Sequence, residues 1–335
     1  MKSEFSNKLK YAVEKEIPFV LFRKPGEKEV FLYVQDHSDS NRFLMHSFDS
    51  KIKKSISDEN PVFIPSEAFE FDFELNLNSA PQFQPKTQSE YEELIRQTIS
   101  EIKNSEIRKI VISRLKQVEN QNYNLLKSYK NLLESHPSAW VYLWHNPGAE
   151  TWMGATPEPL LRLEENQLQT VSLAGTKQPL VEWTEKEFEE QQIVTDFIVD
   201  NFSGTQNLRV NGPETIQAGK FQHLKTYITA EKGENFDLEE LLEKIHPTPA
   251  VCGLPKKEAF DFILKYEGYD RGFYAGYLGI ETGNSKEYFV NLRCAQFFRD
   301  KVCIYVGGGI TADSQPEKEW EETELKSGTV LNGLS

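Results

Sequence analysis

The 335-residue sequence has few cysteines and no long apolar run. Its three cysteines, Cys252, Cys294 and Cys303, form no CxxC pair, which argues against a zinc site or a disulfide framework and predicts reduced, buried thiols. No segment approaches the roughly 20 apolar residues of a membrane-spanning helix. The first 18 residues also lack the continuous apolar stretch of a secretory signal. These absences predict a cytoplasmic protein that does not bind membranes.

Basic residues are scarce: 38 Lys and Arg stand against 52 Asp and Glu, a formal net charge of −14. Nucleic-acid binding requires a basic surface, so this balance disfavours it. The same balance repels small anions, and an anionic substrate would need a metal ion or a local cluster of cations. Hydrophobic residues, at 38%, suffice to build a large core.

Nucleotide-binding motifs are absent too. Three glycines at 307–309 follow an apolar stretch, but no GxGxxG pattern and no Walker lysine continue it. The glycines form either a tight turn or a segment whose backbone amides approach an anion closely.

Apolar patterns that are typical of strands and helices mix without regular βαβ alternation, which predicts an α+β fold with mostly antiparallel sheet. We divide the unit into an N-terminal α+β section, residues 1–85, and a catalytic domain, residues 86–335. Strict alternation predicts a strand over 69–75 with its phenylalanines on one buried face. Ser89 and Glu92 have capping-box spacing at the start of a helix. The stretch 287–298 is predicted to be one strand.

Two predicted helices carry carboxylates three residues apart, Glu187 with Glu190 and Glu319 with Glu322. This spacing places each pair on one helix face. Each pair is either solvated surface or part of a metal site, and oxygen ligands alone would favour Mg²⁺. Neither helix carries a histidine, so a di-iron site is disfavoured.

Lys109 and Glu158 are two candidate acid–base groups. Lys109 precedes Ile110 and Val111 in a predicted strand; it either extends its amine to solvent or, if buried, has a lowered pKa and serves as a base. Glu158, between two prolines, is either an exposed turn residue or a carboxyl whose pKa is raised by apolar surroundings. The spacing of His246, in a proline-rich loop, does not decide between a turn residue and a functional one.

Ten segments in residues 90–332 together resemble the chorismate-utilising enzymes, and within them the isochorismate synthase group. They are KIVISR at 109–114, GATPEPLL at 154–161, SLAGT at 172–176, TEKEFEEQQIVTDFI at 184–198, HLKTYITA at 223–230, HPTPAVCGLP at 246–255, YDRGFYAGYLG at 269–279, VNLRCAQ at 290–296, YVGGGIT at 305–311 and EWEETELK at 319–326. The resemblance implies a large antiparallel β-sandwich wrapped by helices, with the active site between the sheets.

The resemblance also implies the chemistry. Lys109 corresponds to the general base that activates water for attack on C2 of chorismate. Glu158 corresponds to the general acid that protonates the departing C4 hydroxyl. Both roles need shifted pKa values, downward for the lysine and upward for the carboxyl.

By the same resemblance Mg²⁺ is the cofactor and holds the ring carboxylate, which would solve the charge problem. Glu190 and Glu322 correspond to its direct ligands, and Glu187 and Glu319 to an outer pair that acts through water. Implied substrate-binding residues are Gly175 and Thr176 near the ring carboxylate, His246 and Ala250 near the ring, and Tyr274, Arg293, Gly307, Gly308 and Lys326 around the enolpyruvyl carboxylate.

Three positions distinguish members of the family. Aminodeoxychorismate synthases resemble this sequence but carry a nucleophilic lysine at the position of Ala174, and ammonia-using members lack Lys109. Members that also eliminate pyruvate usually carry threonine at the position of Ala250. We therefore expect an isomerase that stops at isochorismate and feeds menaquinone or siderophore synthesis. Salicylate synthase, another family activity and a non-catalytic chorismate-binding scaffold stay as alternatives, and we expect a monomer or a weak homo-oligomer.

Overall fold

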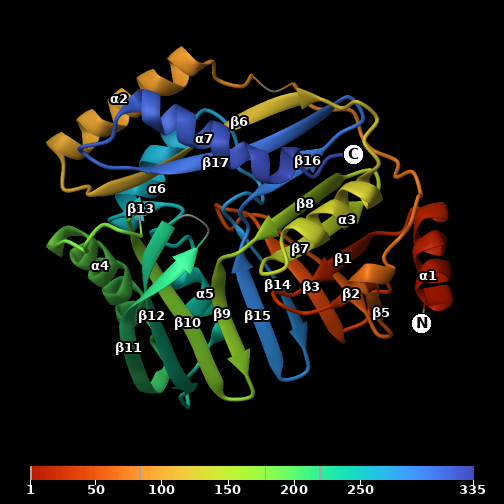
Figure 1. Ribbon diagram of the computed structural model, residues 1–335. Coiled ribbons are helices and arrows are strands. Elements are labelled where there is room, and N and C mark those ends of the chain that lie inside the picture. The colour runs from red at the N-terminus through yellow and green to blue at the C-terminus, as the bar shows by residue number, and fades with distance from the viewer. Residues whose placement is uncertain (1, 83, 178, 219–220) are drawn as a thin grey trace.

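The computed structural model describes residues 2–82, 84–177, 179–218 and 221–335. Two large antiparallel sheets lie in it, with helices around them (Figure 1). This architecture confirms the predicted α+β fold and its helix-wrapped β-sandwich. None of the helices in the described ranges is both long and apolar enough to cross a membrane.

The first sheet has nine strands. In spatial order they are β13 (Gly253–Leu254), β6 (Lys109–Glu119), β17 (Lys301–Ile310), β16 (Cys294–Phe297), β8 (Glu150–Thr156), β7 (Trp140–Asn146), β1 (Phe19–Arg23), β2 (Glu29–Val34) and β5 (Val62–Pro65).

The second sheet has eight strands. In spatial order they are β11 (Thr205–Ala218), β12 (Phe221–Lys232), β10 (Gln167–Lys177), β9 (Pro159–Glu164), β15 (Ser285–Val290), β14 (Tyr277–Thr282), β3 (Asn41–His46) and β4 (Lys53–Asp58). Strands from the first 65 residues therefore enter both sheets.

Aromatic residues fill the space between the sheets. Trp140 of the first sheet packs against Phe43 and Phe289 of the second, with ring centroids 6.4 and 4.9 Å apart. All three side chains are buried. Aromatic side chains bury large apolar areas, so these contacts contribute much of the packing between the sheets.

Helices pack against parts of both sheets (Figure 1). Contacts place α2 and α7 on β6 and β17, α4 on β10 and β12, α3 on β7 and α1 on β2 and β5. The helices are α1 (Lys2–Glu14), α2 (Gln88–Asn104), α3 (Leu125–Ser135), α4 (Glu185–Asn201), α5 (Leu238–Ile245), α6 (Lys256–Tyr266) and α7 (Pro316–Leu331), with a 3₁₀ turn at Ser66–Ala68.

The prediction of a strand over 69–75 is wrong, although phenylalanines of this segment are buried as predicted. Phe69 and Phe71 are buried, and Phe71 stacks on Phe5 of α1 with ring centroids 5.5 Å apart. The segment pairs with no strand, because helices rather than a sheet edge take up its phenylalanines. Alternation of apolar residues reports burial on one side and not hydrogen bonding to a neighbour.

Two further local predictions need correction. The capping box of α2 is formed by Thr87 and Glu90, two residues earlier than the predicted Ser89 and Glu92. The single strand predicted over 287–298 is two strands, β15 and β16, which belong to different sheets. The three cysteines are free and buried, as expected.

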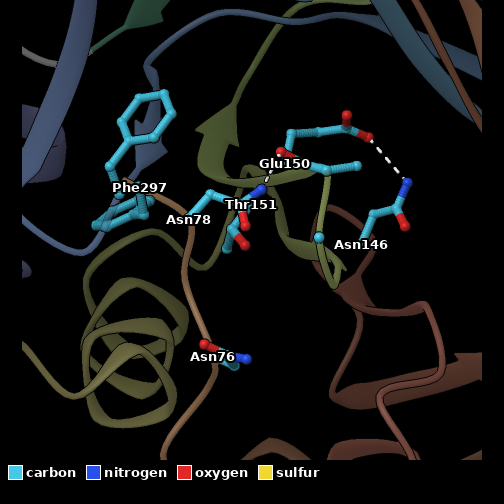
Figure 2. Close-up of a pocket in the computed structure, with 9 residues that line it drawn as sticks. Asn76, Asn78, Asn146, Glu150, Thr151 and Phe297 are labelled. Atoms are coloured by element: carbon cyan, nitrogen blue, oxygen red, sulfur yellow. Dashed lines mark hydrogen bonds between the residues drawn. The ribbon is translucent and has the colours of Figure 1, made fainter. Parts of the chain in front are cut away.

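The connector before α2 is held against the first sheet (Figure 2). Asn78 donates to the carbonyl of Ala149 at 2.9 Å and accepts from the amide of Arg299 at 2.7 Å. Beside it, Asn146 donates to Glu150. Figure 2 shows these side chains around a small hollow, and none of the residues that line it is a predicted site residue.

Candidate active site

Lys109 begins β6, and the neighbouring strand β17 carries a run of three glycines. Gly309 lies opposite Val111, and Gly307 opposite Ser113. A Cβ atom at position 309 would lie 2.6 Å from Cε of Lys109. The Lys109 side chain can therefore occupy its observed position only because residue 309 is glycine.

The amine of Lys109 lies next to helix α4. Its Nζ atom is 3.6 Å from Oε1 of Glu190, and the lysine side chain is 22% exposed. One turn earlier, Glu187 accepts hydrogen bonds from the amide and hydroxyl of Thr184 at 2.9 and 2.5 Å. Glu187 thus closes the capping box that starts α4, while Glu190 pairs with the predicted base.

Glu158 occupies the turn between β8 and β9. Its backbone carbonyl accepts from the amide of Val290 at 2.9 Å, which fixes the turn to β15. Burial raises the pKa of the Glu158 carboxyl to about 6, and the charges of Lys109, Arg293 and Lys326 oppose this rise. Three predicted site cations therefore lie within electrostatic reach of one predicted general acid.

Arg293 lies where the chain crosses from β15 in one sheet to β16 in the other. Its φ of 49° is in the left-handed region, and its carbonyl accepts from the amide of Ala155 at 3.2 Å. Burial lowers the pKa of its guanidinium, and the charge of Glu158 opposes that shift. The crossing thus places the Arg293 charge within electrostatic reach of Glu158. It lies within the stretch 287–298, which was predicted to be one strand.

The second pair of glutamates approaches the glycine strand from α7. A Cβ atom at Gly308 would lie 3.0 Å from Oε2 of Glu319 and 3.9 Å from Oε1 of Glu322. Burial raises the pKa of the Glu319 carboxyl, and the neighbouring Glu322 charge raises it further. Burial and mutual repulsion thus disfavour the ionised form of Glu319, and a bound cation would reduce the repulsion between the two carboxylates.

Lys326 and Tyr274 meet the same strand at Gly307. The amine of Lys326 donates to the Gly307 carbonyl at 2.8 Å and pairs with Glu322 at 2.6 Å. A Cβ atom at 307 would lie 3.0 Å from the hydroxyl of the buried Tyr274. Each glycine of the run therefore makes room for a different predicted site residue or pair: Tyr274, the α7 glutamates and Lys109.

The four glutamates have the right chemistry for a hard divalent cation, because all their donor atoms are carboxylate oxygens. The like-charge repulsion between Glu319 and Glu322 also fits a cation site. In the described ranges, however, no three His, Cys, Asp or Glu side chains converge closely enough to hold a metal ion. The structure thus brings Glu190 to Lys109 and the α7 pair to Gly308, but does not join the two pairs.

The remaining predicted residues come from two other segments. Gly175, with a φ of 68°, lies at a register shift in β10, and a Cβ atom there would lie 3.1 Å from the carbonyl of Glu187. Thr176 continues β10, but its side chain is outside the described part of the structure.

The segment after α5 carries the half-buried Ala250 and the buried His246. Burial, with the Lys256 charge, lowers the pKa of His246 to about 3, so its ring is uncharged at neutral pH.

Sequence reasoning missed a buried ion pair next to these segments. Glu267 and Arg271 are 1% and 3% exposed and bond to each other at 2.6 Å. Their four-residue spacing was visible in the sequence, but such spacing is common on exposed helices. Only the fold shows that this pair is buried.

A scan against protein-family models matches residues 49–335 to the family described as chorismate binding enzyme. Isochorismate synthase MenF of Haemophilus influenzae is 32% identical over 256 residues, 71% of this chain and 59% of that protein. The salicylate biosynthesis isochorismate synthase of Pseudomonas aeruginosa is 28% identical over 263 residues, 73% of this chain and 55% of that protein. The chain thus spans less than two thirds of the length of these relatives.

Solved structures share the fold. The menaquinone-specific isochorismate synthase MenF of Escherichia coli superposes with a TM-score of 0.81 at 20% identity, covering 95% of this chain and 89% of that one. Anthranilate synthase component I of Streptococcus pneumoniae superposes with a TM-score of 0.73 at 17% identity, covering 93% and 92%.

Proposed function

The chain belongs to the chorismate-binding enzyme family, and on that premise we propose that it converts chorismate to isochorismate. Relatives named isochorismate synthase support this assignment. So do Lys109, Ala174 and Ala250, the three positions that distinguish a water-adding isomerase from other members of the family.

The two compounds are isomers, so the reaction consumes one water and releases another. Lys109 takes a proton from the attacking water, whose oxygen bonds to C2 of the ring. The ring double bond shifts, and the C4 hydroxyl leaves as water after Glu158 gives it a proton. Lys109 then loses its proton to solvent and Glu158 gains one from solvent, which restores the neutral amine and the protonated carboxyl.

The observation that carries this proposal is the surroundings of Glu158. A carboxyl with a pKa of about 6 keeps a protonated fraction near neutral pH, as a general acid requires. The cations that act on it, Lys109, Arg293 and Lys326, provide a local positive field for a dianion inside an acidic protein. Arg293, Lys326, Tyr274 and the backbone of Gly307 and Gly308 would hold the enolpyruvyl carboxylate.

For the cofactor we propose Mg²⁺, which would neutralise the ring carboxylate and hold it in place. Glu190 and Glu322 would bind it directly, and Glu187 and Glu319 through water. Gly175 and Thr176 would lie near that carboxylate, and His246 and Ala250 near the ring.

We further propose that the enzyme acts in the cytoplasm, as a monomer or weak homo-oligomer, and feeds menaquinone or siderophore synthesis. Free cysteines support a reducing compartment. The names of the relatives support both outlets, since one solved relative is menaquinone-specific and another relative is the salicylate biosynthesis enzyme.

Incubation of the purified protein with chorismate, with and without Mg²⁺, tests the function. Chromatography should show isochorismate approaching an equilibrium mixture with chorismate, and only with Mg²⁺. Salicylate and pyruvate as main products would show a salicylate synthase. No turnover above the spontaneous rate would show a non-catalytic binding protein.

A further inference from the structure

The buried pair of Glu267 and Arg271 connects two segments of the proposed site. Burying two charges is costly unless both are paired and hydrogen-bonded. Here the guanidinium Nε donates to one carboxylate oxygen at 2.6 Å and Nη2 to the other at 2.7 Å. The arrangement satisfies the fork-shaped guanidinium and leaves further donors for the backbone.

On one side the pair holds strand β6. Oε1 of Glu267 accepts from the amide of Ser113 at 2.5 Å and from its hydroxyl at 2.8 Å. Nη2 of Arg271 donates to the carbonyl of Val111 at 2.7 Å. Lys109, Val111 and Ser113 are spaced two residues apart along β6, so their side chains lie on the same face of the strand.

On the other side the pair holds the segment that follows α5. Nη1 of Arg271 donates to the carbonyl of Val251 at 2.9 Å. Val251 follows Ala250 directly, and the same segment begins with His246. Its end, β13, pairs with β6 at Ile110 and Lys109, and backbone hydrogen bonds from Arg108 and Val111 flank this short contact.

We infer that Glu267 and Arg271 are positioning residues, which fix Lys109 relative to the ring-binding segment 246–251. The inference rests on the proposed function, because it assigns the distance between the base and the substrate to this pair. A shift of about 1 Å in a reacting group costs up to roughly 100-fold in rate. A lysine at 271 keeps the charge but cannot donate to both carbonyls and to Glu267 in the same geometry.

Arg271→Lys tests the inference, and Arg23→Lys is its matched control. Arg23 is also buried and donates to two backbone carbonyls, of Leu133 at 2.6 Å and His136 at 2.5 Å, but it joins β1 to α3. We expect Arg271→Lys to lower kcat about 10- to 100-fold with KM within about threefold, and Arg23→Lys to change neither. Circular dichroism and Tm show whether each variant is folded.

A double-mutant cycle separates positioning from general structural damage. If Arg271 acts through Lys109, Arg271→Lys should cost nothing further in the Lys109→Ala enzyme. Equal losses of kcat in both backgrounds, or a loss no larger than that of Arg23→Lys, would overturn the inference. Should Arg271→Lys not fold, Ser113→Ala removes the hydrogen bonds of the Ser113 hydroxyl to Glu267 and Tyr269 but no charge. The same cycle then applies, with an expected loss of about fivefold.

Amide hydrogen exchange distinguishes failure of the positioning role from failure of the proposed function. The amides of Val111 and Arg108 donate to the carbonyls of Cys252 and Leu254 at 2.8 Å each. They should exchange faster in Arg271→Lys and unchanged in Arg23→Lys. Faster exchange with full kcat would overturn the positioning role alone, whereas a wild-type enzyme that makes no isochorismate would overturn the proposed function.

Discussion

The amine of Lys109 lies 3.6 Å from a carboxylate oxygen of Glu190, so the proposed base and a proposed metal ligand are in contact. A cation bound by Glu190 would compete with the amine of Lys109 for the same carboxylate. If Glu190 binds Mg²⁺ as proposed, metal binding and the protonation state of Lys109 would be coupled, and separate variants can perturb each.

Lys109→Ala removes the proposed base. We expect turnover of chorismate to fall by about 10²- to 10⁴-fold, the usual contribution of general-base catalysis, with little change in Tm. Steady-state kinetics measure the loss. Lys116→Ala, on the same strand but paired with Glu324, is the control and should retain turnover. Full activity in Lys109→Ala would refute the assignment of the base.

Glu190→Gln and Glu322→Gln test the proposed magnesium ligands. An amide is a neutral and weaker donor than a carboxylate, so each variant should need at least about tenfold more Mg²⁺. Calorimetric titration with Mg²⁺ alone checks binding independently of activity. Glu189→Gln, an exposed neighbour on α4, should leave the titration unchanged. The same titration for all three variants would exclude these ligands.

Glu158→Gln should abolish turnover and stabilise the fold at neutral pH. The native pKa of about 6 exceeds the ordinary 4.5, so the folded protein is destabilised by ionisation of this carboxyl. The penalty is absent below about pH 4.5, grows as the pH rises and is complete above about pH 6, where it reaches up to about 2 kcal/mol.

Urea unfolding at pH 5 and pH 8 measures this difference. The stability gain of Glu158→Gln over the wild type should be larger at pH 8. A gain that is equal at both pH values, or a loss at pH 8, would show that the carboxyl is not held in a destabilising environment.

Gly309→Ala tests the space that the glycine strand leaves for Lys109. The new methyl would force the flexible end of the lysine away, so kcat should fall about tenfold or more with little loss of stability. Gly328→Ala, in α7, is the control, because its Cβ would meet Asn332 no closer than 3.4 Å. An unchanged kcat for Gly309→Ala would mean that the position of Lys109 does not matter.

The sequence predicted the fold well where burial patterns are local. The two helices predicted to carry the paired glutamates exist, as α4 and α7. The predictions of a strand over 69–75 and of one strand over 287–298 failed. Strands need hydrogen-bond partners, and these partners come from distant parts of the chain. Arg293 illustrates this: it adopts a positive φ in the short segment where the chain passes from one sheet to the other.

Site residues were predicted as types and motifs, but their arrangement was not. The residues around Glu158 left open whether its carboxyl is exposed or has a raised pKa, and the resemblance implied the raised pKa. In the structure, burial raises this pKa. The separate functions of the three glycines could not be foreseen, because each depends on the register between β6 and β17. Glu267 and Arg271 escaped notice because burial follows from tertiary packing.

The division of the first five strands between the two sheets has a consequence for engineering. β1 pairs with β7 and β3 pairs with β14, so removal of the first 85 residues would bare an edge of each sheet. Exposed edges of this length recruit other chains. A shortened enzyme would therefore aggregate through its open strands, and attempts to minimise this catalyst should trim loops and spare its beginning.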